Sequence, residues 1–171
     1  YDRDIHTIAA ERIGNAELTE DTINDLNYKR NDVASAGITG VMGMGNIPIY
    51  NQMFLEQAKI IRKLANYGSA VFLGRCADYI LKDIKNCTSV YLYADREFRK
   101  NRVKEIYGSN AEIMDKEEKN RADYYNYYTG NRWGDINNYD FAINTSKVSF
   151  EEAADLIYRF AKDKQKNLKD R

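Results

Sequence analysis

Residues 70–75, with the sequence Ala-Val-Phe-Leu-Gly-Arg, decide the fold class. Four apolar residues follow one another without a break and end at a glycine, a pattern typical of a strand that is buried on both faces. Apolar runs at residues 89–93 and 139–144 predict two further strands. Strands that alternate with helices through short turns predict an α/β fold, in which a parallel sheet is flanked by helices on both faces.

Apolar residues at helical spacing, together with capping residues, place the helices around these strands. Asp95 is expected to cap one helix. Ser109 with Glu112 and Ser149 with Glu152 are capping boxes at the starts of two others. We expect the basic tail after the last helix to fray. The predicted helices lie at about residues 50–66, 79–81, 95–107, 109–129 and 149–162.

The region before residue 50 is predicted to be helical at first and flexible afterwards. One helix is expected to begin at Asp2 or Asp4 and to end at Gly14, and a second, short helix follows Thr19. Four glycines close together then predict a flexible loop at about residues 35–48. This loop lacks the Lys-Ser/Thr pair that closes a P-loop, so we interpret it as a mobile connector.

Composition and charge exclude several classes of protein. The 171 residues fit one domain, which we place over residues 1–171. Because 26 basic residues balance 26 acidic ones, no bulk attraction to nucleic acid or to an anionic membrane is predicted. No apolar run reaches the roughly 18 residues of a membrane helix. Cys76 and Cys87 have neither disulfide nor metal-ligand spacing, so we expect reduced thiols in a cytoplasmic protein and no metal site.

Arg75 is the first candidate for a functional residue. It follows Gly74 at the carboxyl end of the predicted strand, where open α/β sheets bind their ligands. A guanidinium at this position can hold a phosphate through two parallel hydrogen bonds. The alternative is a structural ion pair with a nearby carboxylate such as that of Asp78.

A second group of arginines brackets the long charged helix. Arg99 and Arg102 precede it, Arg121 lies within it and Arg132 follows it, close to four tyrosines and a tryptophan. Arginine mixed with aromatic residues is more common at binding sites than on plain surfaces. The alternative is a solvated helix with ion pairs four residues apart, since acidic residues are nearly as frequent here as basic ones.

Residues 2–4, Asp-Arg-Asp, place two carboxylates and a guanidinium at a helix start. They are candidates for ligand binding, although helix capping accounts for one or both aspartates. The only histidine, His6, has no partner with which it could form a catalytic set.

These motifs, in this order, resemble the cytidylate kinase-like family, a branch of the nucleoside monophosphate kinases. The resemblance implies a P-loop nucleoside monophosphate kinase fold with a helical lid at about residues 95–135. It also implies phosphoryl transfer from ATP, with Mg²⁺, to a nucleoside monophosphate similar to CMP or dCMP. The matching residues are 1–4, 71–81, 91–95, 124–130, 133–135 and 139–140.

The resemblance also implies roles for individual residues. Arg75 grips the acceptor phosphate, and Arg102 faces the adenine of ATP. Arg121 and Arg132 reach the transferring phosphate when the lid closes. Cys76 stands where true cytidylate kinases have an aspartate that helps to read cytosine.

The resemblance also implies roles for residues on the acceptor side, and the start of the chain differs from the family pattern. Asp2 and Arg3 are placed at the acceptor or near the metal, and Asp78 can compensate for the missing aspartate. Family members open with a strand and a glycine-rich phosphate loop, which are absent before Tyr1. A truncated chain, a disordered segment left out of the numbering or a degenerate protein would each account for this. Because a sheet without its central strand would expose two edges, we expect one of the first two, so that the natural chain contains this loop.

Three alternatives remain open. The protein could bind a nucleotide without catalysis, or it could be a kinase of another small acceptor, because a fold does not fix function. It could also be an interaction protein that uses its tyrosine-rich helix as a partner surface. The sequence does not indicate the oligomeric state.

Overall fold

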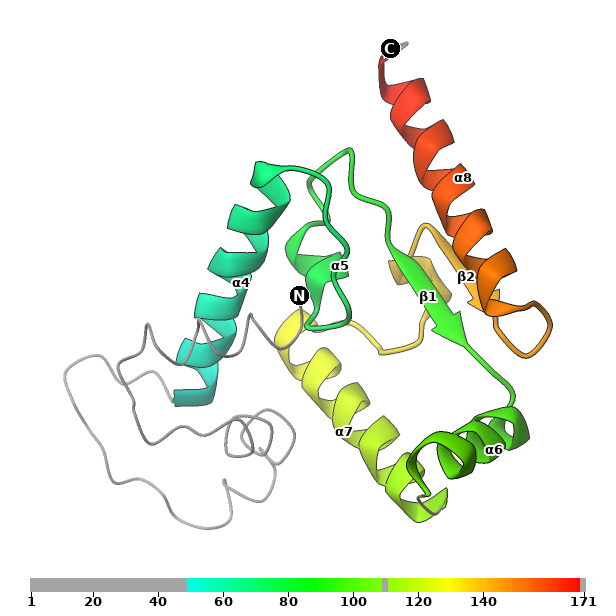
Figure 1. The fold of residues 1–171 in the computed structure, drawn as a ribbon. Coiled ribbons are helices and arrows are strands. Elements are labelled where there is room, and N and C mark those ends of the chain that lie inside the picture. The colour runs from blue at the N-terminus through cyan, green and yellow to red at the C-terminus, as the bar shows by residue number, and fades with distance from the viewer. Residues whose placement is uncertain (1–48, 109–110, 170–171) are drawn as a thin grey trace. The chain divides into compact units, whose positions relative to one another are not determined.

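The computed structural model describes residues 49–108 and 111–169 (Figure 1). The chain separates into two compact units, residues 1–80 and 81–171, and each is described by itself. The two predicted helices and the glycine-rich loop before residue 49 lie outside the described residues, as do Asp2, Arg3 and Ser109. The single domain over residues 1–171 stays a prediction.

The described part of the first unit is helical. Helix α4, Ile49–Tyr67, agrees with the prediction for residues 50–66. Met53, Gln57 and Ile61 are buried at helical spacing and define its inner face. The short helix α5, Ala77–Ile80, contacts α4 and buries its first and last residues.

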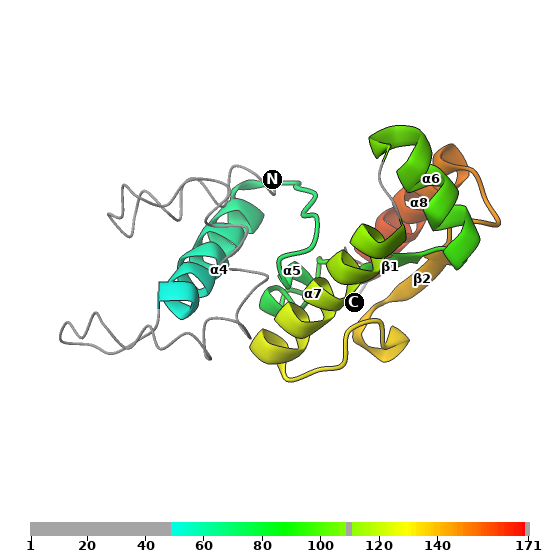
Figure 2. The same cartoon turned by 90° about the horizontal axis from the view of Figure 1, so that it is seen from below.

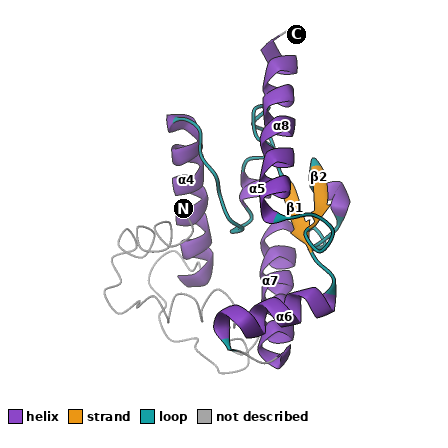
Figure 3. Cartoon of the chain, turned by 45° about the vertical axis from the view of Figure 1, so that its right-hand side comes forward, coloured by secondary structure: helices purple, strands orange, loops and turns teal. Residues whose placement is uncertain are grey.

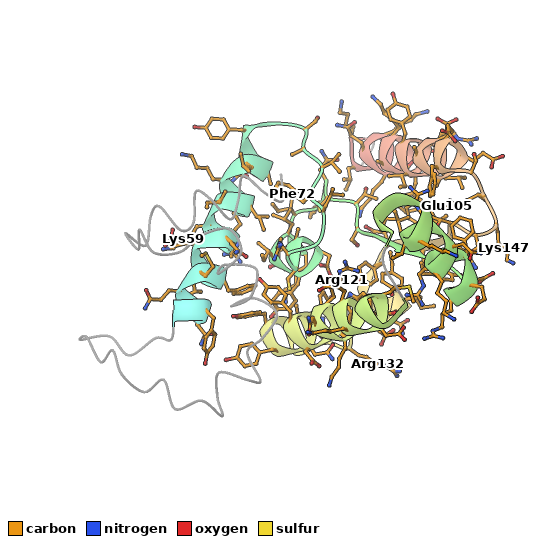
Figure 4. All side chains as sticks on the ribbon, turned by 60° about the horizontal axis from the view of Figure 1, so that its bottom comes forward. Lys59, Phe72, Glu105, Arg121, Arg132 and Lys147 are labelled. Carbon is orange, nitrogen blue, oxygen red and sulfur yellow. The ribbon has the colours of Figure 1, made fainter. Side chains whose placement is uncertain are left out.

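The predicted strand at residues 70–74 is wrong, because residues 70–73 form no regular secondary structure. A strand is defined by backbone hydrogen bonds to a neighbour, and the one sheet of the described structure is formed by other residues. Val71 and Leu73 are 74% and 68% exposed, whereas Phe72 between them is half-buried (Figure 4). Exposure alternates as in an extended chain with one covered face, rather than a strand buried on both faces.

The second unit contains a small parallel sheet. Strands β1, Val90–Tyr93, and β2, Phe141–Asn144, pair from Val90 with Phe141 to Tyr93 with Asn144 (Figure 3). Both strands, their direction and the α/β class confirm the prediction. The chain between them forms α6, Arg96–Tyr107, then α7, Ala111–Thr129, and a 3₁₀ turn, Ile136–Asn138. The predicted lid, about residues 95–135, contains α6 and α7.

Helix α8, Phe150–Lys169, packs on β2 through the rings of Phe141 and Phe160, whose centroids are 4.5 Å apart. Its start confirms the predicted capping box. The Glu152 backbone N–H donates to Ser149 Oγ at 3.1 Å, and the Ser149 N–H donates to Glu152 Oε2 at 2.8 Å. Among the described helices, none combines the length and the apolar character that crossing a membrane requires.

One prediction about a helix end is wrong, and another is confirmed in position only. The tail after Lys162 does not fray, because α8 continues to Lys169. Lys164 anchors this end by donating to the Cys87 carbonyl at 2.6 Å and to Asp140 Oδ1 at 2.8 Å. Asp95 occupies the N-cap position of α6 but makes no capping bond with its side chain. Its carboxylate is engaged elsewhere, as described below.

Asp140 joins the amino-terminal ends of both strands to α8. Its carboxylate accepts hydrogen bonds from the Ser89 backbone N–H at 2.7 Å and from Lys164. Burial by itself raises the pKa of Asp140, but the hydrogen bonds from Lys164 and Ser89 outweigh this effect and lower it. The charged form is therefore the one that stabilises the fold.

We expect Asp140→Asn to reduce the free energy of unfolding by about 1 kcal/mol at pH 7. Because the folded pKa lies below the unfolded one, the contribution is complete above the ordinary aspartate pKa of about 4 and is lost as the pH falls through the folded value. Urea unfolding of both proteins from pH 7 towards acid measures this. If the difference in the free energy of unfolding between the two proteins stays constant from pH 7 to acid, the charge of Asp140 does not stabilise the fold.

Candidate functional site

The turn before α5 has an uncommon backbone. Gly74, Arg75 and Cys76 follow one another with φ angles of 68°, 56° and 55°, all in the left-handed region. The turn is held by the Ala77 N–H, which donates to the Gly74 carbonyl at 3.1 Å, and by the Ile80 N–H, which donates to the Cys76 carbonyl at 2.9 Å. A non-glycine residue in this region costs about 1–2 kcal/mol. Strain of this kind gathers at functional sites, which supports Arg75 as a candidate.

The side chains at this turn differ in charge and in burial. Cys76 is 3% exposed, and burial raises the pKa of its thiol strongly. The carboxylate of Asp78 raises the pKa further, whereas the Arg75 guanidinium lowers it. The thiol therefore stays protonated at neutral pH, and a protonated thiol is a poor nucleophile. Arg75 and Asp78 are half-buried, so two opposite charges lie beside a neutral sulfur at the start of α5.

In the second unit, ion pairs join α6 to α7. Arg96 pairs with Asp115, and Arg99 Nη1 lies 2.6 Å from Glu118 Oε2. Both pairs join residues 19 positions apart, so they follow one register between the two helices. Arg99 also has a buried Nε without a hydrogen-bond partner in the described structure. These arginines therefore bind carboxylates of the neighbouring helix, and not residues four positions away.

The third arginine of α6, Arg102, has a different partner, and Arg121 of α7 is a further exposed arginine. Arg102 lies with its guanidinium carbon 4.1 Å from the centre of the Phe150 ring. Within residues 49–108 and 111–169, neither Arg102 nor Arg121 has a carboxylate partner, and both are exposed. Two exposed arginines of the predicted lid thus have no carboxylate counter-ion among the described residues.

Arg132 lies in the loop after α7, and Figure 4 labels it together with Arg121. Its two sequence neighbours are fixed to the helix. The Asn131 N–H donates to Thr129 Oγ1 at 3.0 Å, and the Trp133 N–H donates to Asn126 Oδ1 at 2.6 Å. The position of the Arg132 backbone is therefore well defined, while its side chain is exposed.

An aromatic cluster attaches this loop to the sheet. Tyr91 of β1 contacts Tyr139 and Tyr93 by stacking, with centroid distances of 5.1 and 6.2 Å, and meets the edge of Trp133 at 6.0 Å. Burial and the Glu118 carboxylate raise the pKa of Tyr91, so its hydroxyl stays protonated at neutral pH. Tyr91 is not among the residues predicted from the sequence, although the many tyrosines are a signal of such packing.

Gly134 closes the same loop with a φ of 77°, and a Cβ atom there would lie 3.1 Å from the Tyr91 hydroxyl oxygen. Tyr91 has little room to move, because three rings surround it. We expect Gly134→Ala to destabilise the protein by about 2 kcal/mol, of which backbone strain supplies about 1–2 kcal/mol. Chemical denaturation measures the loss.

Gly130→Ala is the matched control, because Gly130 has a φ of 71° and open space around its Cβ position. Gly130→Ala should lose only the stability that the left-handed backbone costs an alanine, without a steric contact. Adding Tyr91→Phe to Gly134→Ala should recover the difference between the two glycine variants. Equal losses at both glycines would contradict the proposed contact.

A polar cluster lies at the carboxyl ends of the two strands, where α/β sheets bind ligands. The Asp95 N–H donates to Ser146 Oγ at 2.7 Å, and its carboxylate pairs with Lys147 at 3.1 Å and accepts from Asn144 at 3.3 Å. Hydrogen bonds from Lys147 and Asn144 lower the pKa of Asp95. This cluster is not among the sites predicted from the sequence. A signal was available, because a polar run follows the predicted strand directly.

The predicted site residues are divided between the two units and the part of the chain that the structure does not describe. Arg102, Arg121 and Arg132 belong to the unit 81–171, whereas Arg75 and Asp78 belong to the unit 1–80. Asp2 and Arg3 lie outside the described part of the chain. Within that part, no group of three or more His, Cys, Asp or Glu side chains could hold a metal ion.

Comparisons with known proteins agree with these motifs. The sequence model of the cytidylate kinase-like family matches residues 1–147, a range that ends shortly before α8. The crystal structure of an uncharacterized protein from Eubacterium ventriosum is similar, with a TM-score of 0.61 and 26% sequence identity. The match covers 92% of this chain and 89% of that one. No curated protein matches the chain.

Proposed function

The chain belongs to the cytidylate kinase-like family, and on that premise we propose that it transfers a phosphoryl group from ATP to a nucleoside monophosphate, CMP or dCMP. Membership of this family suggests a kinase-like function that involves nucleotides. The donor, the acceptor and the roles of individual residues are our proposal.

The observation that carries the proposal is that two exposed arginines of the predicted lid, Arg102 of α6 and Arg121 of α7, have no carboxylate partner among the described residues. Arg96 and Arg99, by contrast, are neutralised by acidic residues of α7. An anionic ligand can supply the missing charge. Arginine suits phosphate groups because its planar fork donates two parallel hydrogen bonds, and a triphosphate has several negative charges to accept them.

On the acceptor side we place Arg75 and Asp78. The guanidinium of Arg75 is proposed to bind the phosphate of the monophosphate, and Asp78 to accept a hydrogen bond from the cytosine amino group. Cys76 cannot do this, because its buried thiol stays neutral. Asp2 and Arg3 are proposed to lie at the same acceptor or near the metal.

The proposed reaction requires positioning and charge stabilisation rather than a covalent enzyme intermediate. An oxygen of the acceptor phosphate forms a bond to the γ-phosphorus of ATP. The bond from that phosphorus to the bridging oxygen breaks, and ADP leaves with the electron pair. Arg121 and Arg132 are proposed to stabilise the charge on the transferring group. Closure of the lid, about residues 95–135, would exclude water and so limit hydrolysis of ATP.

ATP-dependent transfer is expected to use Mg²⁺, which usually binds through the phosphates and only one or two carboxylates. The described residues offer no cluster that could hold a metal by itself. We therefore assign the ion no ligand there. Nucleotides are the proposed partners, and a cytoplasmic location stays an expectation.

A coupled assay of ADP release with CMP, dCMP, UMP and AMP tests the proposal on the full-length protein. We expect turnover with a pyrimidine monophosphate and little with AMP. The neutral Cys76 in place of an acidic residue favours one second candidate, a nucleotide-binding module without catalysis. Binding of a monophosphate without release of ADP would select that candidate and reject the kinase.

A further inference from the structure

Two asparagine side chains hold the peptide group that joins Arg132 to Trp133. Figure 2 shows the loop between α7 and β2, which contains this peptide. Its N–H, which belongs to Trp133, donates to Asn126 Oδ1 at 2.6 Å. Its carbonyl, which belongs to Arg132, accepts from Asn138 Nδ2 at 3.0 Å. Both hydrogen-bonding groups of one peptide are therefore bound by side chains from two different elements.

Further hydrogen bonds fix the chain on either side of this peptide. On the preceding side, the Asn131 N–H donates to Thr129 Oγ1 at 3.0 Å, and that hydroxyl donates to the Tyr125 carbonyl at 2.7 Å. On the following side, the Asp135 N–H donates to the Arg132 carbonyl at 3.3 Å. The backbone of Arg132 is thus tied to the last turn of α7 and to the 3₁₀ turn that follows.

The side chain of Arg132 contrasts with this ordered backbone. It is exposed, and among residues 49–108 and 111–169 no carboxylate forms an ion pair with it. Asn126 is exposed as well, so its carboxamide holds the peptide at the surface and not within a core. Peptide groups of surface loops can bond to water instead. Two ordered side chains therefore hold in place the backbone of an arginine whose charge is not compensated there.

We propose that Asn126 and Asn138 are positioning residues, which hold the Arg132–Trp133 peptide so that the Arg132 guanidinium meets the transferring phosphate at one fixed place. The inference rests on the proposed function, in which Arg132 stabilises charge on the transferring group. Because a peptide group is planar, bonds at both of its ends fix its orientation beside the Arg132 Cα. Charge stabilisation depends on donors that are already in place, and a displacement of about 1 Å can lower a rate about 10²-fold.

Aspartate substitutions in the full-length protein test this proposal, because Asn126 accepts a hydrogen bond whereas Asn138 donates one. Aspartate keeps the acceptor at position 126 but has no donor at position 138. We expect Asn138→Asp and Asn126→Ala each to lower kcat about 3–10-fold, with the KM for ATP and for the acceptor unchanged. Asn126→Asp should keep most of the wild-type kcat. Both aspartates add the same charge to the same loop, so charge alone does not predict opposite results.

The matched control is Asn137→Ala, which removes another side-chain amide of the same 3₁₀ turn. Asn137 Nδ2 donates to Asp135 Oδ1 at 2.8 Å and does not bind the Arg132–Trp133 peptide. Asn137→Ala should leave kcat unchanged.

Two measurements separate positioning from a general loss of structure. Without any nucleotide, hydrogen exchange of the Trp133 amide should be about 3–10-fold faster in Asn126→Ala than in the wild type and close to the wild type in Asn126→Asp. With Arg132 already replaced by alanine, Asn126→Ala should cause no further loss of kcat, because no guanidinium remains to be positioned.

The inference is overturned if Asn126→Ala leaves kcat unchanged or lowers it by the same factor with and without Arg132. It is also overturned if the two aspartate variants behave alike, or if Asn137→Ala loses as much activity as Asn138→Asp. A wild-type protein without ATP-dependent turnover would reject the proposed function itself. Failure of the positioning role leaves that turnover intact, so the two failures are distinguishable.

Discussion

Arg121→Ala is expected to lower kcat for phosphoryl transfer by about 10²–10³-fold, the scale on which removing one preorganised donor acts in other enzymes. The variant should be as stable as the wild type. Arg121 is exposed on α7 and has no carboxylate partner among the described residues, so its removal leaves no buried charge unpaired. Alanine is also a good helix former. Steady-state kinetics and thermal unfolding of the same preparation measure both quantities.

Two further variants of α7 make this prediction specific. Lys119→Ala removes an exposed cation from the same helix and should leave kcat unchanged. Arg121→Lys keeps the charge but loses the planar fork, so its kcat should lie between those of the wild type and Arg121→Ala. Unchanged turnover of Arg121→Ala, or an equal loss with Lys119→Ala, would contradict the role of Arg121.

Arg75→Ala is expected to lower kcat/KM for the acceptor by about 10–100-fold, because hydrogen bonds to charged groups contribute about 1.5–3 kcal/mol each. The KM for ATP should change little, since the proposed role of Arg75 is confined to the acceptor phosphate. Kinetics with varied acceptor at saturating ATP, and the reverse, separate the two effects.

Arg75→Gly distinguishes the side chain from the backbone at this position. Both variants lose the guanidinium, and both should lose the same activity. Glycine adopts the φ of 56° without strain, so Arg75→Gly should be more stable than Arg75→Ala by about 1 kcal/mol. If both variants bind the acceptor as the wild type does, Arg75 has a structural role only.

Local patterns in the sequence predict most of the described elements. Helix α4, both strands and the capping box at Ser149 follow from spacings of a few residues, which depend on short-range geometry. The run at residues 70–73 shows the limit of such patterns. Its apolar character indicates an extended chain, but a strand also needs a partner, and partners depend on distant residues. Distant residues also explain why α8 continues beyond the predicted end at Lys162. Its C-terminal half is anchored by hydrogen bonds to Asp140 and Cys87.

The candidate site is predictable in its residue types but not in its contacts. Arg75 could be selected because it follows an apolar run and a glycine, whereas its left-handed backbone could not, since arginine rarely adopts it. The register that pairs Arg99 with Glu118 depends on how α6 crosses α7. The contact of Arg102 with Phe150 likewise joins positions that no local spacing connects.

The most direct test of the kinase proposal is to follow the products of ATP and CMP with the full-length protein by phosphorus NMR. The proposal predicts that CDP and ADP form in equal amounts and that no ADP forms without the acceptor. Release of inorganic phosphate in place of CDP, or unchanged ATP in the presence of CMP, dCMP and UMP, would contradict it.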